Sequence, residues 1–154
     1  MRNFSEVDKK KKHKRLQLAE NPANLSEEML SKLGDTVKAS LQDGNLPCAA
    51  AFRIAQQANV PKIAVGEMSD RLGIRITNCQ IGCFRVNAII NDNLAQKNID
   101  NKIITILEEL RNNNELTCAN VFKLALQLKL TPMAIADVAN FQNLKIQRCQ
   151  LGCF

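Results

Sequence analysis

Residues 79–84 read Cys-Gln-Ile-Gly-Cys-Phe, and residues 149–154 read Cys-Gln-Leu-Gly-Cys-Phe. The two hexapeptides stand 70 positions apart, and the same shift aligns residues 41–84 with residues 111–154 without a gap. Thirteen of the 44 aligned positions are identical. Self-similarity at one fixed interval is the signature of a duplicated structural unit. The sequence therefore predicts two tandem copies of one fold.

Within each copy, the apolar residues recur at the period of an α-helix. Ser26 has the place of an N-cap before a first helix, and a second helix is expected to begin near Cys48. A third helix is expected from Lys62 in the first copy and from Pro132 in the second, where Thr131 can serve as the N-cap. Each copy thus contains three predicted helices.

An alternating apolar and polar pattern closes each copy. It reads Ile74-Arg75-Ile76 in the first copy and Leu144-Lys145-Ile146 in the second, which is typical of a short β-strand. We therefore expect a mainly α-helical protein made of two helix-turn-helix-like modules, each ending in a short strand. The expected units are a flexible basic tail (1–23), a first module (24–84), a packed linker (85–97) and a second module (98–154).

The composition is that of a folded chain. It has 154 residues, of which 45% are apolar and 23% charged, and this excludes wholesale disorder. No apolar run approaches the roughly 18 residues that a membrane span needs, and the N-terminus lacks the apolar stretch of a secretory signal. We expect a cytoplasmic protein without a membrane span.

Positive charge is concentrated at the N-terminus. Residues 1–15 hold seven basic side chains against two acidic ones, so they carry +5 of the formal net charge of +6. Such a tail can neutralise nucleic-acid phosphates or approach anionic lipid headgroups, and it can equally be a solvated extension. Its candidate nucleic-acid contacts are Lys9, Lys10, Lys11, Lys12, Lys14 and Arg15.

The helical pattern resembles a known class of DNA-binding modules. The resemblance rests on Ala-Ala-Ala-Phe-Arg-Ile-Ala at residues 49–55, the turn at Val60-Pro61 and the segment Leu72-Gly73-Ile74-Arg75-Ile76, which together are similar to helix-turn-helix and winged-helix modules. It implies that the third helix of each copy reads double-stranded DNA, one half-site per copy. The candidate contacts are Lys62, Arg71, Asn140 and Gln142. Because three-helix patterns also serve protein docking, a protein partner is the alternative.

All six cysteines fall in the repeat, as Cys48, Cys79 and Cys83 and again as Cys118, Cys149 and Cys153. Three interpretations stay open: buried structural thiols, a metal or redox site, or a disulfide. A zinc ion or an iron–sulfur cluster would need a fourth ligand beyond each triad, and the single histidine, His13, lies in the tail.

The local pattern around these cysteines makes two further predictions. Cys79 and Cys83 would stand about 13 Å apart in an extended strand, so the chain must bend to unite them, and Gly82 permits such a bend. Cys48 and Cys118 lie at predicted helix N-termini, where the helix dipole is expected to lower the pKa of a thiol.

Catalytic patterns are lacking in the sequence. No histidine stands outside the tail to build a Ser-His-Asp or Cys-His site, and there is no glycine-rich phosphate loop. The glutamines shared by the two copies, such as Gln80 and Gln150, are expected to satisfy backbone groups. We therefore expect a non-enzymatic binding protein that recognises DNA, with a protein-interaction or scaffold role as the alternative.

Overall fold

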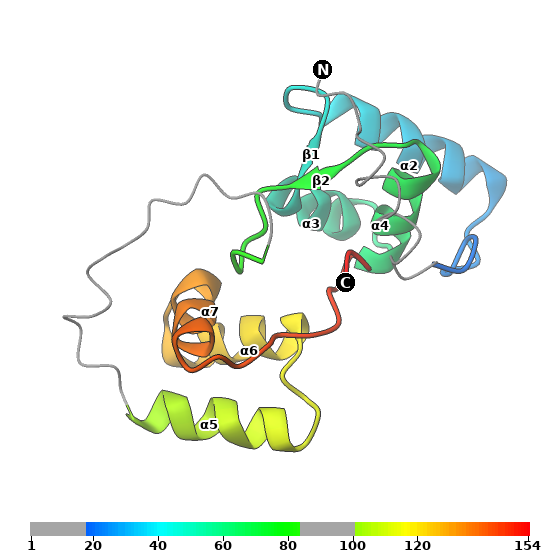
Figure 1. Ribbon diagram of the computed structural model, residues 1–154. Helices are drawn as coiled ribbons and strands as arrows, with labels where there is room; N and C mark the ends of the chain where they lie inside the picture. The colour runs from blue at the N-terminus through cyan, green and yellow to red at the C-terminus, as the bar shows by residue number, and fades with distance from the viewer. Residues whose placement is uncertain (1–17, 84–100) are drawn as a thin grey trace, which may run out of the picture.

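The computed structural model describes residues 18–83 and 101–154 (Figure 1). Within these residues the chain is mainly helical, and its one sheet has two short strands. The elements in chain order are α2 (Glu27–Ala39), β1 (Leu46–Pro47), α3 (Cys48–Gln57), α4 (Lys62–Arg71), β2 (Ile76–Thr77), α5 (Asn101–Asn112), α6 (Cys118–Leu128) and α7 (Pro132–Phe141).

Two of the expected units fall largely or wholly beyond this part of the chain. The predicted linker, residues 85–97, and most of the predicted tail, residues 1–23, lie outside the described residues. Among the described helices, none combines the length and the apolar character that a membrane crossing requires. The helix-turn-helix arrangement stays a prediction, whereas the helices themselves are found where the periodicity places them.

Side-chain caps fix the starts of helices at the predicted positions. The Ser26 hydroxyl accepts a hydrogen bond from the backbone N–H of Met29 at 3.3 Å and so caps α2. The Thr131 hydroxyl accepts one from the N–H of Ala134 at 3.1 Å and caps α7. Both caps satisfy donors that the first turn of a helix leaves without a partner. Both predicted caps are confirmed.

The backbone turns at equivalent places in the two halves. Residues with positive φ recur at the 70-residue interval, as Gly44 and Asn114, Asn59 and Lys129, Gly73 and Asn143, Asn78 and Arg148, and Gly82 and Gly152. Left-handed residues are uncommon outside glycine, so five matching pairs indicate that the two halves follow the same path at these turns. The sequence similarity therefore has a counterpart in the conformation of the chain.

The strands are shorter than the sequence pattern predicts. β1 and β2 pair in parallel over two residues each, and the ladder cannot lengthen readily because Pro47 has no N–H to donate. In the second half, the equivalent contact is a single parallel bridge between Thr117 and Gln147. In both halves the parallel contact lies beside the start of a helix. Because the contact is parallel, it forms no β-hairpin in this part of the structure.

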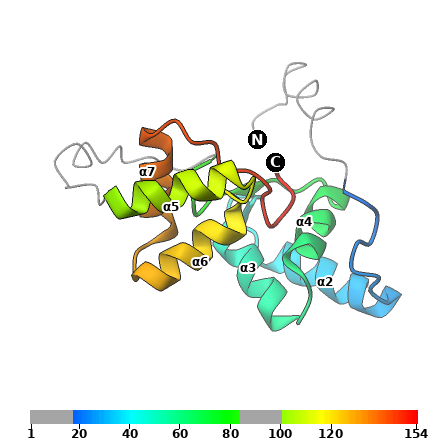
Figure 2. The same ribbon diagram turned by 90° about the horizontal axis from the view of Figure 1, so that it is seen from below.

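Each half has its own apolar core. The first core contains Val37, Leu46 and Val65, with α2 and α3 packed on α4, and the second contains Leu107 and Ile135, with α5 and α6 packed on α7. Seen from below in Figure 2, α2, α3 and α4 form one group and α5, α6 and α7 another, side by side. The two groups meet along one boundary, so both contribute residues to it.

The two halves exchange their hexapeptide turns across this boundary. Ile81, from the first half, is buried in the second core, and Leu151, from the second half, is buried in the first core. Figure 1 shows the segment that follows β2 descending toward α7, while the C-terminal segment rises to α4. Each core is therefore completed by a side chain from the other half.

Both exchanged segments are tight turns. The N–H of Gly82 donates to the carbonyl of Cys79, and the N–H of Gly152 donates to the carbonyl of Cys149, each at 3.0 Å. The two glycines have φ of +70°, which side chains other than glycine rarely adopt. The bend that the sequence predicts between the paired cysteines is confirmed in both hexapeptides.

The contacts of the exchanged turns are reciprocal. A methyl group added to Gly82 would come within 2.9 Å of Met133 Sδ, and one added to Gly152 would come within 2.9 Å of Ile63 Cδ1. Ile63 and Met133 are themselves equivalent positions of the repeat. The two turns therefore meet equivalent residues of the other half, although Gly152 also faces Leu18, with Cδ2 at 2.6 Å from the added methyl group.

Gly66 permits the closest of these approaches. A methyl group at this position would overlap the backbone carbonyl of Leu151. We expect Gly66→Ala to lower the free energy of unfolding by about 1–3 kcal/mol, because the overlap is with backbone and cannot be relieved by a side-chain rotation. Urea denaturation of the full chain measures this change.

Gly34→Ala is the matched control, since it adds the same methyl group to a buried glycine of α2. There the methyl lies 3.5 Å from Met68 Sδ, an ordinary contact, and alanine favours the helix by up to about 1 kcal/mol. This variant should be as stable as the original or more so. A Gly66→Ala protein of undiminished stability would contradict the exchanged packing of Leu151.

Candidate functional site

The exchanged turns gather all six cysteines at the boundary between the two cores. We call this group the cysteine cluster; its members are Cys48, Cys79, Cys83, Cys118, Cys149 and Cys153, and all of them are free thiols. Cys149 and Cys153, from the second half, pack against the first core, which contains Cys48, and Cys79, from the first half, lies in the second core with Cys118. The cluster therefore belongs to the interface rather than to either half alone.

A glutamine of each hexapeptide binds the cysteine that begins a helix in its own half. Gln80 Nε2 donates to Cys48 Sγ at 3.6 Å, and Gln150 Nε2 donates to Cys118 Sγ at 3.6 Å. The prediction that these two glutamines satisfy backbone groups is therefore corrected, because their partners are sulfur atoms. The recurrence of glutamine beside cysteine in both hexapeptides has its reason in this bond.

The environment of the cluster disfavours ionised thiols. Burial raises the pKa of Cys48, and the hydrogen bonds with Gln80 only partly offset it. The pKa of Cys118 is raised far above its ordinary value, first by its hydrogen bond with Cys149 and then by burial. The prediction of a lowered pKa at these helix N-termini is wrong, because burial at Cys48, and the hydrogen bond with Cys149 together with burial at Cys118, outweigh what the helix end supplies.

The thiols interact in pairs, and this bears on metal binding. The hydrogen bond with Cys118 lowers the pKa of Cys149. The hydrogen bond with Cys153 and burial together raise it by more, so that the pKa reaches about 11. Across residues 18–83 and 101–154, no three His, Cys, Asp or Glu side chains are arranged to hold a metal ion. A zinc or iron–sulfur site at the triads stays a prediction, and a metal would have to displace the protons that the raised pKa values of Cys48, Cys118 and Cys149 favour.

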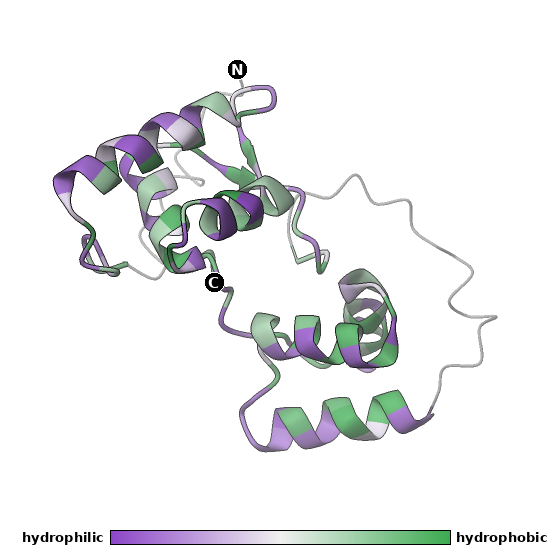
Figure 3. Ribbon diagram, turned by 180° about the vertical axis from the view of Figure 1, so that it is seen from behind, coloured by the Kyte–Doolittle hydropathy of each residue, from purple (hydrophilic) through white to green (hydrophobic). Residues whose placement is uncertain are grey.

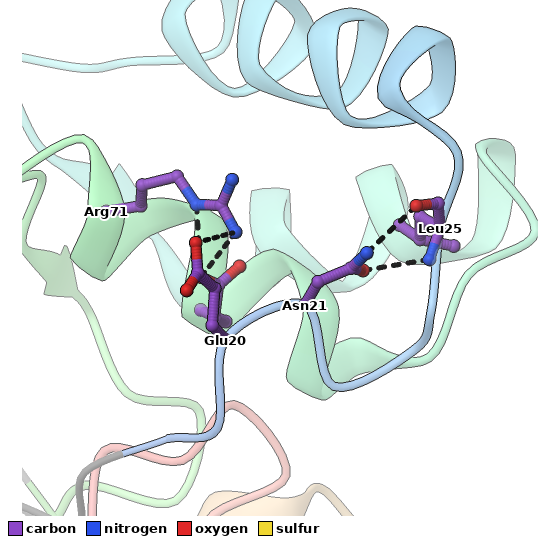
Figure 4. Close-up of polar contacts among 5 residues, drawn as sticks. Glu20, Asn21, Leu25 and Arg71 are labelled. Carbon is purple, nitrogen blue, oxygen red and sulfur yellow. Dashed lines mark hydrogen bonds and ion pairs between the residues drawn. The ribbon is translucent and has the colours of Figure 1, made fainter.

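Arg71, predicted to contact DNA, is engaged by carboxylates. Its Nε and Nη2 donate to Glu67 Oε1 at 3.1 and 3.0 Å, and Nη2 lies 3.9 Å from Glu20 Oε1. Figure 4 shows Arg71 and Glu20 facing one another. The Glu67 side chain is only 9% exposed, so the charge of Arg71 balances a nearly buried carboxylate rather than facing a phosphate.

The other predicted DNA contacts are scattered. Lys62 Nζ lies over the ring of Phe52, 4.9 Å from its centroid. Asn140 is exposed and Gln142 is half-buried at the end of α7. The tail residues Lys9, Lys10, Lys11, Lys12, Lys14 and Arg15 lie outside the described residues.

The helices expected to read DNA are largely covered. Six consecutive residues of α4, 64–69, are buried, since α4 packs on α2 and α3 and also meets the exchanged Leu151. In α7, every residue from 132 to 139 is buried or half-buried. A recognition helix needs an accessible face with donors for base edges, and the middle of α4 has none.

Two surface features were not predicted from the sequence. One is a cleft of about 690 Å³ between α3 and the start of α4. The other is a group of exposed apolar side chains at the end of α6, where Leu126 is 82% and Leu130 is 43% exposed. In Figure 3 the apolar colouring runs along α6 and α7. The signal was present in the alignment of the halves, because Leu126 and Leu130 replace Gln56 and Val60 of the first copy.

We expect the cysteines to react with iodoacetamide in an order set by burial. The half-buried thiol of Cys153 should be modified before the buried thiols of Cys48 and Cys118. Cys83 is exposed, but its hydrogen bond with Cys79 and its burial against neighbouring groups raise its pKa, so it should react more slowly than its exposure alone implies. Because the pKa of Cys149 is about 11, its thiolate fraction, and hence its rate, should rise about tenfold per pH unit from pH 7 to pH 10. Timed alkylation followed by peptide mass spectrometry measures each rate.

The urea-denatured chain is the control for this labelling, since denaturation removes both burial and the thiol pairing. If Cys48 or Cys118 reacted as fast in the folded protein as in the denatured one, the cluster could not be the buried, protonated group described above.

Comparison with known proteins adds no family to this description. No family model matches the chain, and neither a curated protein nor a solved structure matches it. A fold shared by many functions would in any case not settle what this chain does.

Proposed function

We propose that the chain is a non-enzymatic protein-interaction module whose six cysteines are structural. The observation that supports this proposal is the covering of α4, in which residues 64–69 are buried between the first core and the exchanged turn. The resemblance to helix-turn-helix modules assigns the reading of DNA to α4. In the structure, α4 packs between the first core and the turn from the second half. Of the two functions expected from the sequence, the geometry favours protein docking.

The surface offered to a partner lies at the end of α6. We define the α6 patch as Leu126 and Leu130 together with the flanking lysines Lys123 and Lys129, all of which are exposed. A large apolar side chain such as Leu126, which is 82% exposed, is unfavourable in water. Covering it with a partner protein lowers the free energy. The α6 patch therefore has the apolar centre that protein interfaces use.

Charge indicates the chemistry of the partner. Lys123 and Lys129 are the only charged residues between Leu116 and Ala136, so no nearby carboxylate in this stretch neutralises them. A partner segment with apolar side chains and flanking carboxylates would complement both features of the patch. We assign the α6 patch to an acidic, amphipathic segment of another protein.

The roles of the other expected features follow from this assignment. The cysteine cluster holds the halves together through packing and hydrogen bonds and performs no chemistry in the proposal. The main support for DNA binding is the basic tail. The candidate contacts in the described helices are one ion-paired arginine and a few separate polar residues. Duplex binding by the tail alone would depend steeply on salt and little on base sequence.

An acidic amphipathic helical peptide, with leucines and glutamates at helical spacing, tests the assignment. We expect it to bind the full chain, and we expect Leu126→Gln with Leu130→Gln to weaken its Kd at least about tenfold, since apolar anchors dominate such interfaces. Fluorescence anisotropy of the labelled peptide gives the Kd of each variant.

Met29→Gln is the matched control, because Met29 is also an exposed apolar residue, at 41%, but lies on α2. It should leave the Kd unchanged, and a peptide with lysine in place of glutamate should not bind. The proposal fails if the double variant binds the peptide as tightly as the original. It also fails if a chain with neutral residues at positions 9–15 binds one duplex sequence in preference to others at physiological salt.

A further inference from the structure

The cleft between α3 and α4 has a lining of one charge sign. Its polar lining residues are Arg53, Lys62, Gln56, Asn59 and Gln80, and none of its lining residues is acidic. Within the described part of the chain, neither Arg53 nor Lys62 forms an ion pair with a carboxylate. Two unneutralised cations in one concavity create a positive potential that attracts anions.

The side chains of the cleft are held in place by their neighbours. Lys62 Nζ lies 4.9 Å from the centroid of Phe52, and the Phe52 ring packs on Phe122 with centroids 5.1 Å apart. Gln80 Nε2 is tied to Cys48 Sγ at 3.6 Å, which leaves its carbonyl oxygen free of that bond. The ammonium group and this amide are therefore positioned before any ligand arrives, which lowers the entropic cost of binding.

We propose that this cleft binds a small organic phosphate monoester. The two positive charges of Arg53 and Lys62 match the double negative charge of such a group, and a guanidinium can hold two of its oxygens at once. The amides of Gln56, Asn59 and Gln80 can bind hydroxyl groups on the rest of the molecule. The volume of about 690 Å³ lies within the range of ligand sites for molecules of nucleotide size.

The second half carries different side chains at the equivalent positions. Lys123 replaces Arg53, Leu126 replaces Gln56 and Lys129 replaces Asn59. Pro132, which carries no charge, takes the place of Lys62. Each half therefore has two cations among these positions, but in the second half none stands at the start of the following helix, and one of the amides has become an exposed leucine. We place the proposed phosphate site in the first half, independent of the α6 patch.

Adenosine 5′-monophosphate is the probe, with adenosine as its uncharged counterpart. We expect the monophosphate to shift the backbone amide resonances of residues 53, 62 and 80 of the full chain, and adenosine to shift them little. Arg53→Gln should weaken the Kd at least about tenfold, because it removes one charge and the paired hydrogen bonds. Arg53 is exposed, so its replacement should leave the fold intact.

Lys145→Gln is the control, since it removes one exposed positive charge from the second half at a residue that belongs neither to the cleft nor to the α6 patch. It should leave the Kd of the monophosphate unchanged. The proposal is overturned if adenosine shifts the same resonances as strongly, or if Lys145→Gln weakens binding as much as Arg53→Gln. A DNA duplex without terminal phosphates that displaces the monophosphate would also overturn it, by assigning the cleft to the nucleic-acid backbone.

Discussion

The exchange of Ile81 and Leu151 between the two cores is the contact on which the rest of the structure depends. Each half is small, and a small domain buries only a modest part of its apolar surface by itself. Each exchanged turn supplies a buried aliphatic side chain to the other core, so the two halves stabilise one another. The close approach of Leu151 to Gly66 shows how little space separates the turn from α4.

This exchange accounts for features that look unrelated in the sequence. It places the six cysteines at one boundary, where burial and hydrogen bonds between thiols raise the pKa values of Cys48, Cys118 and Cys149. It also covers α4 and α7, the helices that the resemblance assigns to DNA. Two other surface features, the cleft and the α6 patch, lie on equivalent parts of the two halves. Their side chains differ in polarity. A polar cleft stands in one half and an apolar patch in the other.

Much of the local structure could be predicted from the sequence. The helices begin at the predicted caps Ser26 and Thr131, and the bends at Gly82 and Gly152 occur where glycine permits them. These features depend on neighbouring residues, whose preferences local sequence expresses directly. Of the short strands predicted at the end of each copy, the first is found at Ile76–Thr77, and the second is reduced to a single bridge between Thr117 and Gln147. The exchange itself could not be predicted, because a repeat reveals equivalent positions and does not say which half each one contacts.

The thiol chemistry was misjudged for a related reason. A helix N-terminus favours a thiolate locally, but the pKa of Cys118 is decided by Cys149 and by burial, both of which depend on tertiary packing. The two surface features do not show in the positions at which the copies agree, because those positions serve the shared fold. The positions that differ, such as Gln56 against Leu126, carried the information about binding surfaces.

Nuclear Overhauser effects between the exchanged turns and the helices test the central contact most directly. The exchanged arrangement predicts cross-peaks from the Ile63 δ1 methyl to Gly152 and from the Met133 ε methyl to Gly82. If each turn instead folded back on its own half, the cross-peaks would join Ile63 to Gly82 and Met133 to Gly152. That second pattern would contradict the account.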